Sequence, residues 1–309
     1  MFLKEIVYLT EIHKRGSITA AAEHLFISQA ALSKYLKNVE KQVGSPLFSR
    51  MGNELAPTYI GRQYLESAAK ILRVQDNWNL EQSDLLGEEK GSINVLIPPI
   101  RSSTVIPYVM PRFWRSFPNV EVFLLEEASF VLEKLETHQY IDFAISSDTE
   151  SDAGLIQAYL GSEEIVLVLP KGHPSAEMAV EREGCRYPWL DIRLLRDEQF
   201  ILNPRDQITG KVAAQLFEQA GITPKVPLYT RNNYTAIQLA ATGPALTFAP
   251  ETYVREASCA QSLSCYSVGY PWSEIKLYAS YKKGRYFSSY ARVFLDLIRE
   301  YMFQATKLD

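Results

Sequence analysis

Residues 17–50 decide the fold of this 309-residue chain, and they read SITAAAEHLFISQAALSKYLKNVEKQVGSPLFSR. Ser17 or Thr19 can cap a short helix over residues 20–25, because a side-chain hydroxyl accepts a hydrogen bond from a free N–H group at a helix start. The consecutive alanines in this helix allow a second helix to pack closely against it. The stretch therefore opens with a short helix that is suited to close packing.

A second, longer helix begins after Ser28, which is a natural N-cap. It ends at Gly44, where a left-handed backbone is favoured. One face is apolar at steps of four, three and four residues, as expected of a buried stripe, and the opposite face is small and polar and then basic. The stripe comprises Leu32, Leu36, Val39 and Val43, and the opposite face comprises Gln29, Ala30, Ser33, Lys34, Lys37 and Lys41.

The polar face suits a helix that enters the major groove of DNA with its N-terminus first. Gln29 can form a bidentate pair with adenine, Ser33 can bond a base or a phosphate, and the lysines neutralise phosphates. The alternative is a solvated lysine face on an ordinary surface helix. The spacing of the two helices favours DNA binding. The predicted contacts are Ser28, Gln29, Ala30, Ser33, Lys34, Lys37 and, from the next segment, Arg50.

The stretch resembles the winged helix-turn-helix of LysR-type transcriptional regulators, with many positions matching at fixed offsets and without a gap. It departs at Ile18, where an aromatic residue is usual, and at residues 57–61, which replace a typical Leu-Thr-x-Ala-Gly. Both departures concern packing near the wing and leave the DNA-reading helix intact. The matching positions are Gly16, Ser17, Ala21, Ala22, Leu25, Ser28, Gln29, Ser33, Lys34, Val39, Glu40, Gly44, Leu47, Phe48, Arg50, Thr58 and Gly61.

The resemblance implies a transcription regulator that binds double-stranded DNA at an interrupted palindrome. It further implies a homodimer or homotetramer, control by a small-molecule effector, and contact with RNA polymerase. We expect effector binding to change subunit packing and DNA bending.

The winged domain is predicted to cover residues 1–58. Residues 47–50 and 54–57 read as short strands, and the Gly-Asn pair at 52–53 accepts the positive φ that a tight hairpin requires. Arg50 at the base of this wing is expected to reach a phosphate or the minor groove. Plain surface exposure is the alternative for this arginine.

Two further helices flank the reading helix and the wing. Residues 2–14 supply the third helix of the core. Residues 59–88 contain no proline and carry two columns of apolar residues at seven-residue spacing, which predicts a long linker helix with a dimer seam. Packing of that helix within its own subunit is the alternative. The columns comprise Tyr64, Ile71, Trp78 and Leu85, and next to them Leu65, Leu72 and Leu86.

Residues 89–309 change to alternating strands and helices, which predicts parallel α/β units. The order resembles the effector domain of LysR-type regulators, which is similar to two-lobed periplasmic binding proteins. Lobe I is expected at about residues 91–161 and 268–309, and lobe II at about residues 162–267. The predicted fold is therefore α/β, with an all-α winged helix-turn-helix domain, a long linker helix and a two-lobed effector domain. The landmarks are residues 141–145, 172–174, 220–224 and 243–246.

Polar residues follow the ends of several predicted strands. Ligands of parallel α/β sheets bind at these ends, where helix N-termini offer free N–H groups to anions. We therefore expect a small organic anion between the lobes, and the resemblance implies the same positions; helix capping or exposure to water is the alternative for each residue. The predicted contacts are Arg101, Ser102, Ser103, Thr104, Ser146, Asn203, Arg205, Thr230 and Phe248, and the strand ends also carry Ser147, Arg231 and Asn232.

Composition limits the remaining possibilities. The net charge is −4, but residues 1–62 carry eight Lys or Arg and five Glu, a charge of +3, which leaves −7 for the remainder. A basic end on an acidic body suits one DNA-facing module. No apolar run approaches the roughly 18 residues of a membrane span. Lys4 and Glu5 interrupt any signal-peptide core, so we expect a cytoplasmic protein without a membrane partner.

We expect no enzyme, cofactor or metal site, because the sequence contains no Gly-rich phosphate loop, nucleophile elbow or metal-spaced His or Cys set. Cys185, Cys259 and Cys265 are expected to be reduced thiols. The last two could form a redox pair, although no basic cluster lies near them to lower a thiol pKa. Two other classes stay open, namely an enzyme or solute-binding protein with a helix-turn-helix docking module, and a constitutive DNA-architectural protein.

Overall fold

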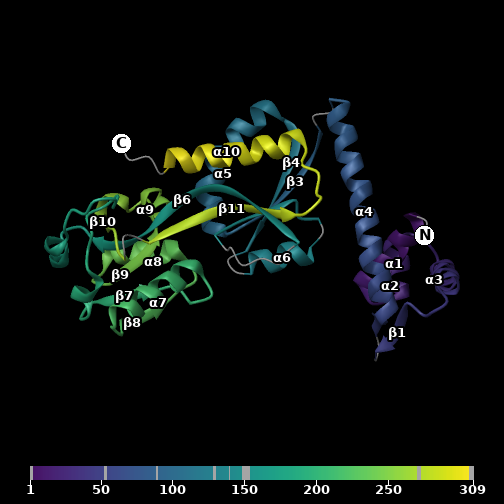
Figure 1. Ribbon diagram of the computed structural model, residues 1–309, viewed down its shortest axis with the longest axis horizontal. Coiled ribbons are helices and arrows are strands. Elements are labelled where there is room, and N and C mark those ends of the chain that lie inside the picture. Colours follow the sequence, from purple (N-terminus) through teal and green to yellow (C-terminus); the bar gives the residue numbers. More distant parts are fainter. Residues whose placement is uncertain are drawn as a thin grey trace. The chain divides into compact units, whose positions relative to one another are not determined.

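The computed structural model describes residues 3–51, 54–87, 90–127, 130–138, 140–147, 154–269 and 273–305. The chain divides into two compact units, Met1–Leu86 and Gly87–Asp309 (Figure 1). Each unit has its own sheet and its own hydrophobic core.

The first unit is a helix-turn-helix with a two-stranded wing and a long final helix, as the sequence predicted. Ser17 rather than Thr19 caps the first short helix, since its hydroxyl accepts the N–H of Ala20. Ser28 caps the next helix in the same way, and Gly44 ends it with φ +77°. The elements are α1 (Leu3–Arg15), α2 (Ile18–His24), α3 (Gln29–Val43), β1 (Phe48–Met51), β2 (Glu54–Pro57) and α4 (Tyr59–Leu85).

The core of the first unit lies between α1, α2, α3 and the first turns of α4. Leu32, Leu36 and Val39 are buried there as predicted, but Val43 is 40% exposed. The prediction for Val43 was wrong because the helix ends at this residue, where no further element covers its side chain. The other buried members of the core are Ile6, Tyr8, Leu9, Ile12, Ala21, Ala22, Leu47, Phe48, Tyr64 and Ala68.

Hydrogen bonds connect both strands of the wing, or the residue just before them, to the helical part of the unit. A carboxylate oxygen of Glu40 on α3 accepts the backbone N–H of Leu47 at 2.8 Å, and the carbonyl of Gly16 accepts the N–H of Leu55 at 2.8 Å. Strand β1 pairs antiparallel with β2, with Arg50 opposite Leu55. These bonds fix the wing relative to α3. The predicted turn at residues 52–53 lies outside the described residues.

The second unit contains a sheet of nine strands in its described part, in the order β4-β3-β5-β11-β6-β9-β7-β8, with β10 also paired to β6. Strands β3, β4 and β5 are parallel, as are β7, β8 and β9, whereas β6 and β11 run antiparallel to their neighbours. The bounds are β3 (Lys90–Ile97), β4 (Asn119–Glu126), β5 (Phe143–Ser146), β6 (Leu155–Pro170), β7 (Gln199–Leu202), β8 (Lys225–Tyr229), β9 (Leu246–Pro250), β10 (Leu263–Tyr266) and β11 (Glu274–Lys282).

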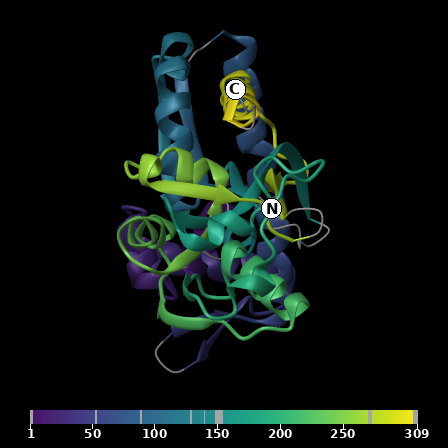
Figure 2. The same cartoon turned by 90° about the vertical axis from the view of Figure 1, so that its left-hand side faces the viewer.

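Helices cover this sheet in two groups, which makes the unit two-lobed. Helices α5 and α10 lie side by side on lobe I (Figures 1 and 2), where Phe113 and Phe294 meet edge to face at 5.2 Å. The lobe II core centres on Phe200, Phe217 and Phe248. The helices are α5 (Pro99–Ser116), α6 (Val131–Thr137), α7 (Ile208–Ala220), α8 (Asn233–Thr242), α9 (Glu251–Arg255) and α10 (Ser289–Ala305), with short 3₁₀ turns η1 (Pro174–Met178), η2 (Ile192–Leu195) and η3 (Ala260–Ser262).

Two boundaries differ from the sequence prediction. The sequence pattern predicts a helix from about residue 105 to residue 117, but α5 already begins at Pro99, because proline is accepted in the first helical position. The apolar run at residues 165–169 predicts a strand that begins at Ile165, but β6 already begins at Leu155. Its first half is half-buried and pairs with β11, and so lacks the continuous apolar run by which strands are recognised. The strand β10 and the helix α9, of four and five residues, were not predicted.

Strands β6 and β11 connect the two lobes. The first half of β6 pairs with β11, and its second half pairs with β9 and β10 of lobe II. The β11 strand in turn pairs with β5 of lobe I. Any movement of one lobe against the other must therefore bend these two strands.

We expect Gly61→Ala to destabilise the first unit. A Cβ at this position would lie 1.9 Å from the carbonyl oxygen of Leu47, which also accepts the backbone N–H of Thr58 at 2.9 Å. The free energy of unfolding should fall by about 1–3 kcal/mol although alanine is the better helix former. Chemical denaturation measures the change.

Gln63→Ala, on the exposed face of the same turn, is the matched control. It should change the free energy of unfolding by no more than about 0.5 kcal/mol. If Gly61→Ala and the control have the same free energy of unfolding, α4 and the segment before the wing can move apart without loss of stability.

Candidate functional site: an exposed reading helix and an interlobe cavity

The helix α3 presents the predicted DNA-facing residues on one solvent-facing side. Gln29, Ala30, Lys34 and Lys37 are exposed, and Ser33 is half-buried at the edge of the same face. The hydroxyl of Ser28 caps the helix by accepting the N–H of Ala31 at 3.2 Å, and its side chain is otherwise exposed.

The basic side chains Lys34 and Lys37 of this face, and Arg50 of the wing, are not engaged in ion pairs with other described residues. Within the described residues, no ion pair engages Lys34, Lys37 or Arg50, and Arg50 is exposed on β1 of the wing. The Glu11 carboxylate of α1, by contrast, pairs with Arg15 of the same helix and with His24 of α2. The structure thus leaves three cations on α3 and the wing open to an anionic partner such as a phosphate backbone.

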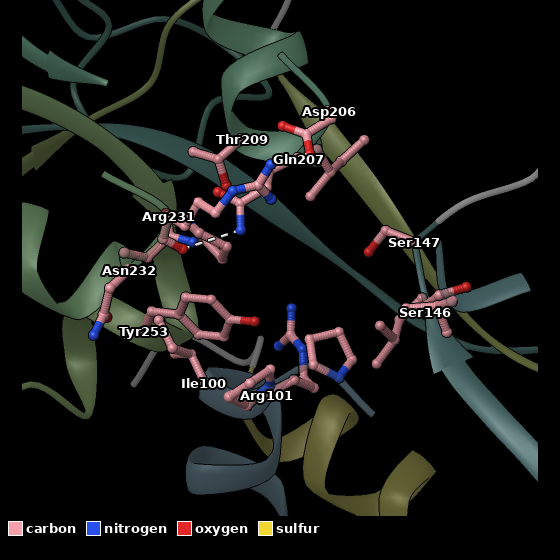
Figure 3. A pocket seen from close by; sticks show the side chains of 17 residues that line it. Ile100, Arg101, Ser146, Ser147, Asp206, Gln207, Thr209, Arg231, Asn232 and Tyr253 are labelled. Atoms are coloured by element: carbon pink, nitrogen blue, oxygen red, sulfur yellow. Dashed lines mark hydrogen bonds and ion pairs between the residues drawn. The ribbon is translucent and has the colours of Figure 1, made fainter. Parts of the chain in front are cut away.

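A cavity of about 270 Å³ lies in the second unit, between the two lobes. Figure 3 shows side chains entering it from three sides, with Arg231, Asp206 and Gln207 of lobe II on one side and Ser146 and Ser147 at the end of β5 on another. The start of α5 and α9 form the third side. The lining residues are Pro98, Pro99, Ile100, Arg101, Val131, Ser146, Ser147, Asp206, Gln207, Ile208, Thr209, Arg231, Asn232, Asn233, Pro250, Tyr253 and Leu277.

Of the nine predicted effector residues, Arg101 and Ser146 line this cavity. The hydroxyl of Ser146 is buried and has no hydrogen-bond partner among the described residues. Asn203 and Thr230 do not line the cavity; the amide of Asn203 donates to the carbonyl of Thr230 at 2.8 Å, and the hydroxyl of Thr230 accepts the N–H of Asn232.

The other five predicted residues do not line the cavity, which corrects the expectation for them. Ser102, Ser103 and Thr104 lie inside α5 rather than before it; Ser103 and Thr104 bond backbone carbonyls of their own helix, and Ser102 is buried. Arg205 is exposed to solvent. Phe248 points into the lobe II core and stacks on Phe200 at 5.8 Å, because alternate residues of β9 face opposite sides of the sheet.

Sequence reasoning missed several lining residues for identifiable reasons. Asp206, Gln207 and Thr209 directly follow the strand end at residues 203–205, so extending that segment by four residues would have found them. Tyr253 belongs to the unpredicted helix α9. Asn233 follows two strand-end residues that the sequence did indicate.

A buried polar network joins the lobes at the floor of the cavity. The guanidinium of Arg101 is 3% exposed, donates to Thr252 at 3.1 Å and pairs with Glu163 of β6. It also lies 4.7 Å from the ring centre of Tyr253. Burial alone would lower the pKa of Arg101, but the Glu163 carboxylate raises it above its ordinary value, so the side chain stays charged. Arg101 therefore ties α5 of lobe I to the crossover strand and to α9 of lobe II.

The next residue of the crossover strand, Glu164, faces a second acid. Glu251 accepts the backbone N–H of Glu164 at 2.9 Å and is itself paired with Arg186. Burial raises the pKa of Glu164 to about 7, and the charge of Glu251 adds to the rise while Ser267 and Arg186 oppose it.

The cysteines form no disulfide, and two of them have raised thiol pKa values. All three are free thiols. Burial and the nearby Glu251 and Glu164 carboxylates raise the pKa of Cys265 to about 12, and burial raises the pKa of Cys185 as well. Thiols with raised pKa values are poor nucleophiles, which argues against redox sensing at these two positions.

Comparison with known proteins decides the family. The model for the bacterial regulatory helix-turn-helix protein of the lysR family matches residues 3–62, and the model for the LysR substrate binding domain matches residues 86–303, more than half of the chain. The chain belongs to the LysR family. It is a DNA-binding transcription regulator with an effector-binding domain, not an enzyme, as the sequence predicted.

Individual LysR relatives agree over the whole length. The chain is 29% identical over 309 residues to the uncharacterized HTH-type transcriptional regulator YcgK of Bacillus subtilis, covering 97% of this chain and 94% of that protein. A full-length OxyR variant from Pseudomonas aeruginosa has the same fold, with a TM-score of 0.72 at 19% identity over 97% of this chain and 98% of that one. Full-length CbnR complexed with its target DNA gives a TM-score of 0.57 at 19% identity, covering 97% and 100%.

Two features are absent from the described residues of this LysR-family chain. None of their helices is both long and apolar enough to cross a bilayer. No group of three or more His, Cys, Asp or Glu among them has the arrangement of a metal site.

We expect Arg101→Met to lower the free energy of unfolding of the effector unit by about 3–5 kcal/mol, because it leaves the buried Glu163 carboxylate unpaired. The double variant Arg101→Met/Glu163→Met should recover most of this loss. Arg193→Met, which breaks the exposed Arg193–Asp191 pair, is the control and should leave the free energy of unfolding nearly unchanged. Equal losses in the single and double variants would show that the pair is not coupled.

Glu164→Gln should change how stability depends on pH. Glu164 ionises near pH 4.5 when unfolded and near pH 7 when folded, so the native protein loses stability as pH rises through this window. At pH 8 the variant should be more stable than the wild type by about 2–3 kcal/mol, and at pH 4.5 the two should converge. Urea unfolding at both pH values measures this, with the exposed Glu177→Gln as control. A difference that does not vary with pH would contradict the assignment.

Proposed function

We propose that a small molecule bound in the interlobe cavity controls where and how this regulator binds DNA. The observation that carries the proposal is the position of the cavity, which both lobes line at strand ends and helix starts. A ligand there contacts the two lobes at once, so it can favour one lobe arrangement over another. Such a difference in affinity is what a ligand needs in order to shift an equilibrium.

The ligand is proposed to carry an anionic group such as a carboxylate. The helices α5, α7 and α8 all begin at the cavity wall, and helix N-termini favour negative charge through their free N–H groups and dipoles. Closure around the ligand would bend β6 and β11 and disturb the Arg101–Glu163–Thr252 network at the floor. These contacts are the proposed route from ligand to lobe geometry.

The DNA contacts are proposed to be Ser28, Gln29, Ala30, Ser33, Lys34 and Lys37 of α3, with Arg50 of the wing. Their support is the exposed face of α3 and the absence of ion pairs on its cations within the described chain. CbnR, which has a similar fold, is known in a complex with its target DNA. The helix enters the major groove with its N-terminus first, and the wing lies on the neighbouring backbone.

We further propose a homodimer or homotetramer that binds an interrupted palindrome. Ile71, Trp78 and Leu85 are 40%, 51% and 74% exposed on α4, which is unusual for large apolar side chains at seven-residue spacing. A second α4 would cover them and place two reading helices on two half-sites. The proposed setting is the cytoplasm, where the bound regulator contacts RNA polymerase.

Lys34→Ala and Lys37→Ala should each weaken DNA binding and reduce the slope of log K against log salt by about 1, because each removes one phosphate contact. Gln29→Ala should instead cost about 1–3 kcal/mol on the selected sequence and little on random DNA. Selection from a random duplex library supplies the DNA, and fluorescence anisotropy at several salt concentrations measures affinity. Lys171→Ala, exposed in the effector unit, is the control. An equal loss of DNA affinity in the control variant would contradict the assignment of the DNA contacts to α3.

A further inference from the structure

The charges of the cavity wall are already balanced within the protein. Arg101 pairs with Glu163, and Arg231 pairs with Asp206 at 2.5 Å. The wall contains no other charged side chain among its described residues. A ligand with a net negative charge would therefore find no surplus positive side chain, and it would meet the Asp206 carboxylate. A ligand of zero net charge fits this balance.

Among the three helix starts at the wall, α7 offers the most uncapped N–H donors. Pro98 and Pro99 at the start of α5 have no N–H group, so only Ile100 and Arg101 precede its first intrahelical bond, and the Asn232 side chain caps α8 by accepting the N–H groups of Tyr234 and Thr235. The α7 helix has no side-chain cap, and its first intrahelical bond comes from Lys211. The N–H groups of residues 208–210 thus precede that bond, and they form the place for a carboxylate.

Residues with unpartnered hydrogen-bond acceptors line the same cavity. Gln207 and Asn233 are each 8% exposed, and the amide oxygen of each lacks a partner among the described residues. The orientation of the Gln207 amide is set by its Nε2 donor, which bonds the carbonyl of Arg231 at 3.0 Å (Figure 3). With the Asp206 carboxylate these oxygens make an acceptor set, which calls for a ligand that donates several hydrogen bonds.

The rest of the wall suits an uncharged group. Pro98, Pro99 and Ile100 from α5, Val131 from α6 and Leu277 from β11 face the cavity from lobe I. Ser146 offers a hydroxyl, and no unpaired charge lies on this side of the described wall. At about 270 Å³ the cavity is at the small end of the range for ligand sites.

We propose that the effector is an α-amino acid with an uncharged side chain. Its carboxylate lies on the start of α7, its ammonium donates to Asp206, Gln207 and Asn233, and its side chain extends toward α5 and Leu277. An α-amino acid holds its two charged groups one carbon apart, which suits donors and acceptors that line one small cavity. This assignment rests on the proposed function and specifies the ligand class of the same cavity.

The test uses the full-length protein and the twenty common L-amino acids, each at about 10 mM, in thermal unfolding and then titration calorimetry. We expect at least one with an uncharged side chain to raise the unfolding midpoint by about 3 °C or more. The analogue of that amino acid without its amino group, and its amide without the carboxylate, should each bind at least about tenfold more weakly.

Variants locate the ammonium site. Asp206→Asn should raise the Kd of the amino acid about tenfold or more and leave the Kd of the analogue without an amino group unchanged or lower. Asp206 is exposed, so the variant should fold. Asp197→Asn removes an exposed acid that pairs with Lys225 on the same lobe and is the matched control; it should leave both Kd values unchanged.

Two outcomes overturn the assignment. The first is equal binding of the analogue without an amino group, and the second is no midpoint shift with any of the twenty amino acids. If a ligand without an amino group then stabilises the protein and alters its DNA affinity, with both effects lost in Asn233→Ala, the proposed function stands with another ligand class. If no ligand from a broad metabolite panel changes either the midpoint or the DNA affinity, the proposed function falls as well.

Discussion

The buried ion pair between Arg101 and Glu163 constrains the whole effector unit. A guanidinium that is 3% exposed has to keep its partners, because an unpaired charge in the interior is far more costly than a paired one. Its partners lie on the crossover strand β6 and on α9 of lobe II, while Arg101 itself belongs to α5 of lobe I. The two lobes therefore share one charged network at the place where the strands β6 and β11 cross between them, and the relative position of the lobes is coupled to it.

That network also determines what the cavity can recognise. Because Glu163 neutralises Arg101 and Asp206 neutralises Arg231, the cavity has arginines in its wall but no excess of positive charge among its described residues. Recognition then depends on the finer arrangement of donors and acceptors. Among the three helix starts, α7 keeps the most N–H groups uncapped by a side chain, and the unpartnered amide oxygens of Gln207 and Asn233 belong to residues that line the same cavity. The site is asymmetric for this reason, with a polar end in lobe II and a mostly apolar end in lobe I.

The DNA-binding unit shows a simpler relation between sequence and structure. The caps at Ser17 and Ser28, the left-handed Gly44 and the buried stripe of α3 all depend on residues within a few positions of one another. The sequence predicted each of them, and it failed only for Val43, whose burial depends on what lies beyond the helix end. In the effector unit the order of strands and helices was predictable, but the starts of α5 and β6 were not. Proline can either precede or open a helix, and a half-buried crossover strand lacks a continuous apolar run.

The sequence by itself determined the helix-turn-helix, its exposed polar and basic face, the long α4 and the alternation of strands and helices, because local spacing and capping set all of these. Only the tertiary structure decided which strand-end residues reach the cavity. It brought Arg101 to Glu163 and Thr252, which are 62 and 151 positions away in the chain, and it turned Phe248 into the core. It also paired Arg231 with Asp206, 25 positions apart. The physical reason is that charge neutralisation and hydrogen-bond pairing depend on distance in space, and neither composition nor periodicity records which distant residues will meet.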